Sequence, residues 1–329
     1  MKKTAIAIAL TAVFATPVAH SAVDVIKIDG SSTVYPITEA VAEEFQKETG
    51  IKVTVGVSGT GGGFKKFCRG ETVISDASRP IKAKEIAQCK EAGISFIELP
   101  VAFDALTVVI NPTNDWAKEL TVEELKLAWE PEAQGKIMNW SQVRPGMPDQ
   151  PLHLFGPGSD SGTFDYFTEA VNKKEKAIRG DFTASEDDNV LVTGVAGDKG
   201  GMGYFGLAYY LENKDKLTAV AVKNKDGKFV LPSKETVMDG SYNPLARPLF
   251  IYINATKGAF DPKVKKFIEY YLKNAGKMSS EVGYIPLTAE EYQAITNHYT
   301  KLKTGSAFGG KAEIGLKVEE ILKRVQDND

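Results

Sequence analysis

Two long apolar stretches, residues 96–111 and 249–254, constrain the fold of this chain more than any other feature. Each has the character of a buried strand, and a long middle segment lies between them. We interpret them as strands on which the chain leaves one lobe, builds a second and returns. The sequence therefore predicts two lobes with a cleft between them, lobe 1 formed by residues 23–105 plus 250–329 and lobe 2 by residues 106–249.

The segment before the first stretch alternates between strand and helix patterns. Residues 25–29 predict a strand, and apolar residues from Val34 to Phe45 follow at helical spacing. Two further cycles place strands and helices at residues 52–58, 64–67, 73–74 and 82–92. This alternation predicts an α/β fold with an open, mostly parallel sheet and helices on both faces. Further helices are expected at residues 122–129, opened by a capping box of Thr121 and Glu124, at 264–275 and at 318–325.

The first 22 residues have the pattern of a secretory signal peptide, because Lys2 and Lys3 precede an apolar run that ends in small residues. We therefore expect a soluble periplasmic protein from which this signal peptide has been cleaved. No other stretch approaches the roughly 20 apolar residues of a membrane span. The full chain has a formal net charge of −3. Loss of the two lysines leaves about −5, which favours neither nucleic acid nor an anionic membrane as a partner.

Cys68 and Cys89 are the only two cysteines. Export would deliver them to an oxidising compartment, and they are close enough in sequence to be bridged. We expect a structural disulfide between them. The alternative is a reactive or metal-binding thiol pair, although the spacing fits no zinc pattern.

Three clusters of glycine and hydroxyl residues each stand immediately before an apolar helical pattern. A helix start leaves backbone N–H groups unpaired and carries partial positive charge, so it attracts anions without a lysine or arginine. Each cluster alone is compatible with ordinary caps and turns. Together they predict an anion site where helix starts converge. The clusters are Gly30-Ser31-Ser32-Thr33, Ser58-Gly59-Thr60-Gly61-Gly62-Gly63 and Ser159-Asp160-Ser161-Gly162-Thr163.

The segment 74–80 adds one carboxylate and one guanidinium, those of Asp76 and Arg79. A carboxylate only accepts hydrogen bonds, so Asp76 beside an anion site would select a protonated phosphate over sulfate, which has no proton to donate. Arg79 would supply positive charge through its planar fork. The alternatives are a turn or capping role for Asp76 and a surface ion pair for Arg79.

Catalytic and cofactor motifs are weak or absent. Residues 201–206 match the dinucleotide pattern G-x-G-x-x-G, but no clear strand precedes them. The chain has no P-loop and no G-x-S-x-G motif, and neither His153 nor His298 stands in a context that suggests a general base. Metal-ligand spacing is also absent. We therefore expect no enzyme, no cofactor and no metal.

Taken together, several motifs resemble the periplasmic phosphate-binding proteins of the high-affinity phosphate ABC importer, the PstS family, and particularly its cyanobacterial, SphX-like type. The resemblance covers nearly the whole mature chain. The motifs that carry it are Gly30-Ser-Ser-Thr-Val-Tyr-Pro36, Gly56-Val-Ser-Gly-Thr-Gly-Gly-Gly63, Ala77-Ser-Arg-Pro-Ile81, Leu99-Pro-Val-Ala-Phe-Asp-Ala-Leu106, Asp160-Ser-Gly-Thr-Phe164 and Gly203-Tyr-Phe205.

This resemblance implies a type II periplasmic binding protein fold that closes on phosphate between its lobes. It also implies a set of phosphate-binding residues, with Asp76 as the proton-accepting carboxylate and Ser78 as its rival. Better-known members carry an arginine where this chain has Pro157, so we assign the cationic role to Arg79. The complete expected set is Ser32, Thr33, Ser58, Asp76, Ser78, Arg79, Ser161, Gly162 and Thr163.

The function expected from the sequence is capture of inorganic phosphate and its delivery, by a monomer, to the membrane permease subunits of an ABC importer. Two alternatives stay open. One is a phosphate sensor without a transport role. The other is a phosphatase or acyl hydrolase that uses Ser161 or Ser58 as its nucleophile, for which the sequence offers no obvious base.

Overall fold

A computed structural model describes residues 24–159, 161–185, 187–311, 320–321 and 323–324. The expected signal peptide, residues 1–22, and most of the expected tail helix, residues 318–325, lie outside this part of the chain. The other strands and helices expected from the sequence are present. Within the described residues, no helix combines the length and the apolar character needed to cross a bilayer.

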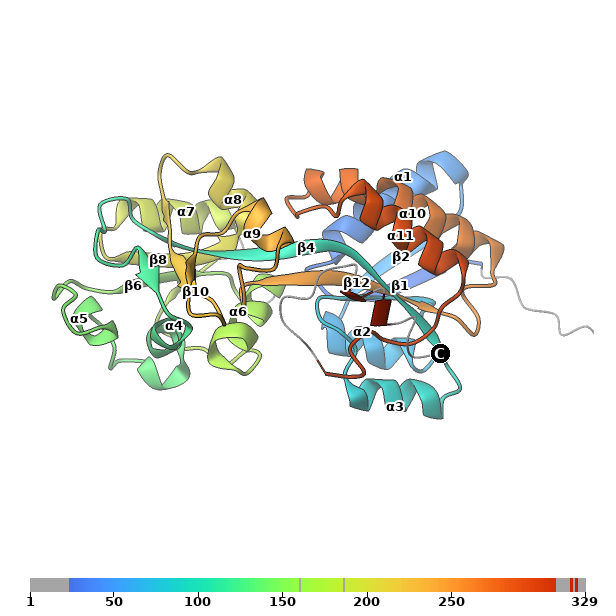
Figure 1. The fold of residues 1–329 in the computed structure, drawn as a ribbon, viewed down its shortest axis with the longest axis horizontal. Helices are drawn as coiled ribbons and strands as arrows, with labels where there is room; N and C mark the ends of the chain where they lie inside the picture. The colour runs from blue at the N-terminus through green and yellow to red at the C-terminus, as the bar shows by residue number, and fades with distance from the viewer. Residues whose placement is uncertain (1–23, 160, 186, 312–319, 322, 325–329) are drawn as a thin grey trace, which may run out of the picture.

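The main structural element is a large mixed sheet (Figure 1). Its strands lie in the order β2, β1, β3, β12, β4, β8, β6 and β7, and β9 also pairs with β4. A separate small sheet has the order β11, β10 and β5. The bounds are Ile26–Gly30 (β1), Val53–Val57 (β2), Ile74–Ala77 (β3), Phe96–Ile110 (β4), Glu119–Leu120 (β5), His153–Gly156 (β6), Thr183–Ala184 (β7), Gly201–Gly206 (β8), Thr218–Ala219 (β9), Ala221–Lys223 (β10), Phe229–Val230 (β11) and Ala246–Asn254 (β12).

Strand pairing is parallel at both flanks of the large sheet and antiparallel in its centre. β1 pairs in parallel with β2 and β3, and β6 pairs in parallel with β7 and β8. β12 runs antiparallel to β3 and β4, and β4 runs antiparallel to β8. A chain that crosses between two flanks and returns must run in opposite directions on the two passes. The expectation of a mostly parallel sheet therefore holds for the flanks and is wrong for the centre.

Strand β4 pairs with other strands at both ends of the molecule. All 15 of its residues are buried. Residues 96–105 pair with β12, and residues 106–110 pair with β8. Figure 1 shows β4 and β12 running side by side between two groups of helices. The second crossing strand begins at Ala246, three residues before the expected start at residue 249. The sequence pattern placed its start late because Arg247 and Pro248 interrupt the apolar run.

Helices cover both faces of the sheet at the β1–β3 end (Figure 1). Side chains along β12 alternate between two cores, with Ile251 and Ile253 in one and Phe250 and Tyr252 in the other. This period of two is expected of a strand that is buried on both faces. One face carries α1 (Tyr35–Thr49), α10 (Pro262–Glu281) and α11 (Ala289–Thr300), and the other carries α2 (Gly59–Phe67) and α3 (Ala83–Glu91).

A second group of helices surrounds the β6–β8 end. Trp129 packs edge-on against Phe167 and Tyr204, with ring centroids 5.4 and 5.0 Å apart, and this contact anchors α6. The predicted capping box is confirmed, because the Thr121 N–H donates to Glu124 at 2.8 Å and the Glu124 N–H donates to Thr121 at 3.1 Å. The helices are α4 (Val122–Trp129), α5 (Trp140–Val143), α6 (Gly162–Asn172), α7 (Asp188–Gly197), α8 (Leu207–Glu212) and α9 (Lys234–Met238), with a 3-10 turn at Pro131–Ala133.

The disulfide expected between Cys68 and Cys89 is confirmed. It joins the end of α2 to α3, and both cysteines are buried in the core that contains Phe64 and Phe67. The bridge therefore ties two helices to the same face of the sheet. It leaves neither thiol to react or to bind a metal.

Replacing both cysteines, as C68A/C89A, should lower the free energy of unfolding. The bridge spans a sequence separation of 21 residues. Loss of a constraint of this length on the unfolded chain should cost about 3 kcal/mol. Urea titration followed by circular dichroism measures the effect, and reduced wild-type protein is the matched control. Unchanged stability in the double variant would show that the bridge contributes nothing.

Candidate functional site

The loops that follow β1, β2 and β3 meet at one edge of the sheet. Gly30 at the end of β1 pairs with Val57 at the end of β2, and also with Asp76 near the end of β3. Because these strands are parallel, their carboxyl ends lie together, which is where ligands bind in open α/β sheets. The two Ser- and Gly-rich clusters that follow β1 and β2 are thereby brought side by side.

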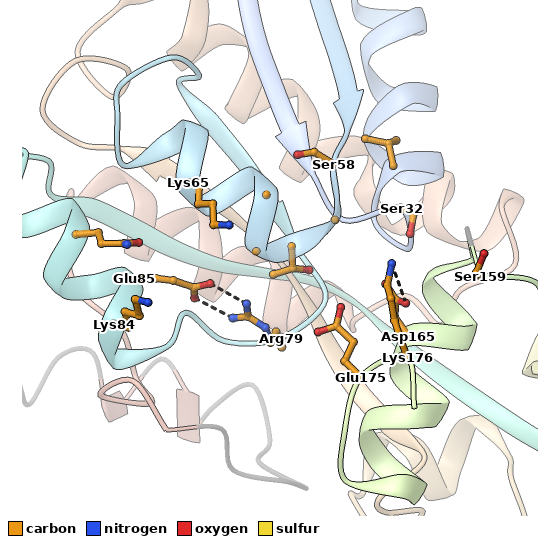
Figure 2. Close-up of a pocket in the computed structure, with 16 residues that line it drawn as sticks. Ser32, Ser58, Lys65, Arg79, Lys84, Glu85, Ser159, Asp165, Glu175 and Lys176 are labelled. Atoms are coloured by element: carbon orange, nitrogen blue, oxygen red, sulfur yellow. Dashed lines mark hydrogen bonds and ion pairs between the residues drawn. The ribbon is translucent and has the colours of Figure 1, made fainter. Parts of the chain in front are cut away.

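An open cleft of about 570 Å³, called the outer cleft, lies between these loops and the segment around α6. Figure 2 shows Ser32, Ser58, Lys65 and Arg79 on one side, and Ser159, Asp165, Glu175 and Lys176 on the other. A smaller cavity of about 20 Å³, called the inner cavity, shares part of this lining. The inner cavity is lined by Ser31, Ser32, Gly59, Thr60, Ser78, Arg79, Asp165, Glu169, Glu175 and Arg247.

The first cluster forms the turn before α1. Ser31 and Thr33 are buried, and Ser32 lines both the outer cleft and the inner cavity. The Ser31 N–H donates to the Asp76 carbonyl at 3.0 Å, which holds the turn against β3. The Thr33 hydroxyl faces Arg247 and accepts a hydrogen bond of 3.1 Å from its Nη2. Of the two residues expected here, Ser32 therefore lines the cavities, whereas Thr33 holds a guanidinium.

The second cluster starts α2 close to β1. A Cβ at Gly63 would lie 2.5 Å from the Gly30 Cα, so only glycine permits this approach. Ser58 lines the outer cleft, and its hydroxyl donates to the Asp29 carboxylate, which also holds Lys66 at 2.5 Å. Thr60 was not singled out from the sequence, yet it lines both the outer cleft and the inner cavity. Glycines surround Thr60 in the sequence, so the pattern did not indicate it as a separate ligand-binding residue.

Ser78, the rival to Asp76, lines the inner cavity together with Thr60. Their hydroxyl oxygens are 3.1 Å apart, and the Ser78 N–H donates to the Thr60 hydroxyl at 3.2 Å. The structure thus joins the loop after β3 to the start of α2. Two hydroxyls, one from the start of α2 and one from the loop after β3, are therefore positioned together at one wall of the inner cavity.

The third cluster lies at the edge of the site. Ser161 caps α6, because its hydroxyl accepts the Thr163 N–H at 3.2 Å, and Gly162 is the first residue of the helix. Among the described residues of this segment, Ser159 and Asp165 line the outer cleft, whereas Ser161 and Thr163 do not. The structure therefore does not bring the hydroxyls of the third helix start to the inner cavity beside those of the first two.

Asp76 does not occupy the position expected of a ligand-contacting carboxylate. Its side chain is completely buried and is absent from the lining of both cavities among the described residues. The Thr38 hydroxyl donates to its Oδ1 at 3.0 Å, and its Oδ2 has no hydrogen-bond partner in the described chain. Burial raises the pKa of Asp76 to about 8. The structure thus places the Asp76 carboxylate against Thr38 of α1, and direct contact between Asp76 and the ligand stays a prediction.

Arg79 lines both cavities, but a carboxylate already occupies its fork. Its Nη1 and Nη2 donate to the two oxygens of Glu85 at 2.9 and 2.8 Å. Figure 2 shows this bidentate pair at one wall of the cleft. The guanidinium also lies 5.7 Å from the Phe64 ring centroid. The ion pair named as the alternative role of Arg79 therefore exists, in a largely buried setting.

The opposite wall is acidic. Asp165, Glu169 and Glu175 line the inner cavity, and the Lys176 ammonium lies 3.7 Å from Asp165 Oδ1. Burial raises the pKa of Asp165 to about 6. Its Oδ1 accepts no hydrogen bond from the part of the chain that the structure describes. Asp165 is therefore a carboxylate of the cavity wall that pairs with Lys176, and the sequence pattern had not singled it out.

The described residues contain no group of three or more His, Cys, Asp and Glu side chains able to hold a metal. His153 interacts with Asp198 and His298 is buried in α11, and neither lines the two cavities of the described chain. The chemistry available in the cleft is hydrogen bonding by hydroxyls and backbone N–H groups, together with two guanidiniums, several carboxylates and the ammoniums of Lys65, Lys84 and Lys176.

Asp76→Asn should remove a pH dependence of folding stability. The pKa of Asp76 is about 8 in the folded protein and about 3.9 in the unfolded chain. Burial therefore favours the protonated acid, and wild-type stability should fall by a few kcal/mol as the pH rises from about 4 to about 8. Asn mimics the protonated acid, so the variant should gain stability relative to wild type across this window.

Urea titrations at several pH values measure this difference. Asp149→Asn, at an exposed carboxylate, is the control and should follow the wild-type curve. Parallel curves for Asp76→Asn and wild type would show that Asp76 is ionised in both the folded and unfolded states.

Comparison with known proteins shows the family to which this chain belongs. The model of the PBP superfamily domain matches residues 16–275. Protein SphX of Synechococcus elongatus is 55% identical over 296 residues, which is 90% of this chain and 87% of that protein. The phosphate-binding protein PstS of Staphylococcus saprophyticus is 41% identical over 270 residues, 81% of this chain and 82% of that protein.

A solved structure shows the same arrangement. A possible phosphate-binding protein from Planctomyces limnophilus matches with a TM-score of 0.80 and 46% identity, over 86% of this chain and 99% of that one. An ABC-type phosphate transport receptor from Vibrio cholerae shares the fold with a TM-score of 0.64 and 24% identity, over 80% of this chain and 99% of that one. The chain therefore belongs to the PBP superfamily, in the family of the SphX and PstS proteins, and has the type II periplasmic binding protein fold.

Proposed function

We propose that this protein captures inorganic phosphate in the inner cavity and delivers it to the permease subunits of an ABC importer. One observation carries the proposal: hydroxyls from the segments that follow three parallel strands, those of Ser32, Thr60 and Ser78, meet at a single small cavity beside two guanidiniums. The names of the PstS and Planctomyces limnophilus relatives, a phosphate-binding protein and a possible phosphate-binding protein, agree with it.

Neutral donors would supply most of the contacts. α2 begins at Gly59, beside the inner cavity, so its first N–H groups and its dipole favour an anion there. The Ser32, Thr60 and Ser78 hydroxyls add donors that can rotate toward the phosphate oxygens. We keep Arg79 in the ligand set as a donor beside them. Ser161, Gly162 and Thr163 would join the set when α6 moves toward the cavity.

The proposed capture requires two lobes that close on the ligand. We assign residues 23–105 and 250–329 to lobe 1 and residues 106–249 to lobe 2. In support, β4 changes its partner from β12 to β8 between Ala105 and Leu106. Bending of β4 and β12 near this point would bring α6 toward Ser32 and Thr60.

We propose that the protein is exported to the periplasm and that it binds phosphate there without catalysing a reaction. A serine nucleophile needs a base within hydrogen-bond reach. Ser161 caps α6 and Ser58 is hydrogen-bonded to Asp29, whose carboxylate is shared with Lys66. No histidine of the described chain lines either cavity. Ser161 is therefore engaged as a helix cap, and the carboxylate within reach of Ser58 is held in an ion pair that weakens it as a base; no cofactor or metal is needed for binding.

Calorimetric titration of ligand-stripped, refolded protein tests the proposed function. We expect tight binding of phosphate that excess sulfate does not displace, because the cavity offers carboxylate acceptors that only a protonated anion satisfies. Absence of phosphate binding would overturn the proposal. In cells, deletion of the gene should abolish high-affinity phosphate uptake, whereas unchanged uptake with an altered phosphate response would favour a sensor.

Asp165→Asn should weaken discrimination between phosphate and sulfate. Near pH 7.5, above its pKa of about 6, Asp165 presents an ionised acceptor to the cavity. An amide can donate to sulfate, so the variant should bind sulfate more tightly and phosphate more weakly, changing the affinity ratio at least about tenfold. Competition calorimetry measures the ratio, with Asp149→Asn as the control. A wild-type ratio in Asp165→Asn would show that another group selects the anion.

A further inference from the structure

We propose that Arg247, and not Arg79, supplies the formal positive charge that holds the anion in the inner cavity. This inference rests on the proposed function and identifies a residue that the sequence analysis did not consider. Arg247 lies at the start of β12, one of the two strands that cross between the ends of the molecule. It lines the inner cavity together with Ser31, Ser32 and Ser78.

Contacts from three separate elements hold the Arg247 guanidinium in place. Its Nη2 donates to the Thr33 hydroxyl at 3.1 Å, in the turn before α1. Its Nε and Nη2 lie 3.4 and 3.3 Å from Asp104 Oδ2, on the neighbouring strand β4. The guanidinium carbon lies 3.7 Å from the centroid of the Tyr166 ring of α6. The Tyr166 hydroxyl in turn donates to the Pro244 carbonyl at 2.5 Å, which fixes the ring.

The two arginines differ in how tightly the carboxylates named here hold them. Arg79 makes short bonds to both oxygens of Glu85, at 2.9 and 2.8 Å, so Glu85 occupies its fork. Arg247 contacts one oxygen of Asp104 at 3.3 and 3.4 Å, longer than the roughly 2.7–2.9 Å of a strong charge-assisted bond. Burial raises the pKa of Asp104 despite this arginine beside it. The Arg247–Asp104 pair is therefore looser than the Arg79–Glu85 pair.

The position of Arg247 also suits a cleft that closes. It sits at the junction of the turn before α1, strand β4 and helix α6, so it keeps contact with both sides of the cleft. Its partner Asp104 is directly opposite in the strand register. An anion beside Arg247 would lie between Ser32 and Asp165, which both line the same cavity. Arg79 stays a donor in this arrangement, and its pair with Glu85 also fixes the loop after β3.

Calorimetric titration of four arginine variants with inorganic phosphate tests this assignment. Arg247→Gln should weaken binding at least about 30-fold, because it removes a buried charged partner of the anion. Arg247→Lys should lose less, since it keeps the charge without the planar fork. Arg79→Gln should lose less than Arg247→Gln. Arg179→Gln removes another buried arginine, paired with Asp181 away from the cavity, and controls for general loss of stability.

An affinity for Arg247→Gln within about threefold of wild type, or a larger loss in Arg79→Gln than in Arg247→Gln, would overturn the inference. The Asp104→Asn variant gives a second test, in which the expected change in phosphate affinity is an increase. Removing the compensating carboxylate should tighten phosphate binding, which a purely structural role for Arg247 does not predict. Unchanged or weaker binding in a folded Asp104→Asn protein would contradict the inference. If wild-type protein binds no phosphate, the proposed function itself fails.

Discussion

The pairing of β4 with β12 on one part of its length and with β8 on the other is the interaction on which the whole structure depends. Because every residue of β4 is buried, this strand joins the cores at both ends of the molecule. The continuous sheet sets the carboxyl ends of β1, β2 and β3 opposite α6. The cleft therefore follows from strand topology before any side chain in it is considered.

Charges around the cleft are held by specific partners in the protein. The Asp29 carboxylate accepts a hydrogen bond from the Ser58 hydroxyl and forms an ion pair with the Lys66 ammonium. Arg79 pairs with Glu85, and Arg247 pairs with Asp104. A buried charge without a partner is costly, so these pairs allow a polar cavity to exist between two cores. A cavity of this kind binds an anion mainly through oriented hydroxyls and backbone N–H groups. In the function proposed above, the carboxylates in its wall select the protonation state of the anion.

Much of the fold was predictable because it depends on local pattern. The helix around Val41 and Phe45, the strand around Val55 and the Thr121–Glu124 capping box follow from apolar spacing and short-range hydrogen bonds. The antiparallel centre of the sheet was not predicted, because strand direction is a property of the path between lobes. The start of β12 was placed late, since Arg247 and Pro248 break the apolar run from which a strand is recognised.

The candidate site, like the fold, has one part that the sequence predicts and another that only the tertiary structure shows. The sequence by itself determined that segments rich in hydroxyls and glycine stand at helix starts, because the apolar pattern of each helix is local, and Ser32 and Ser58 do line the cleft. Only the tertiary structure decided that Asp76 is buried against Thr38 of α1 while Ser78, beyond the end of β3, faces the inner cavity, since elements distant in the sequence pack around each of them. The same holds for Arg247 and Asp165, which reach the cavity from β12 and α6: residues far apart in the chain meet only when the sheet between them has formed.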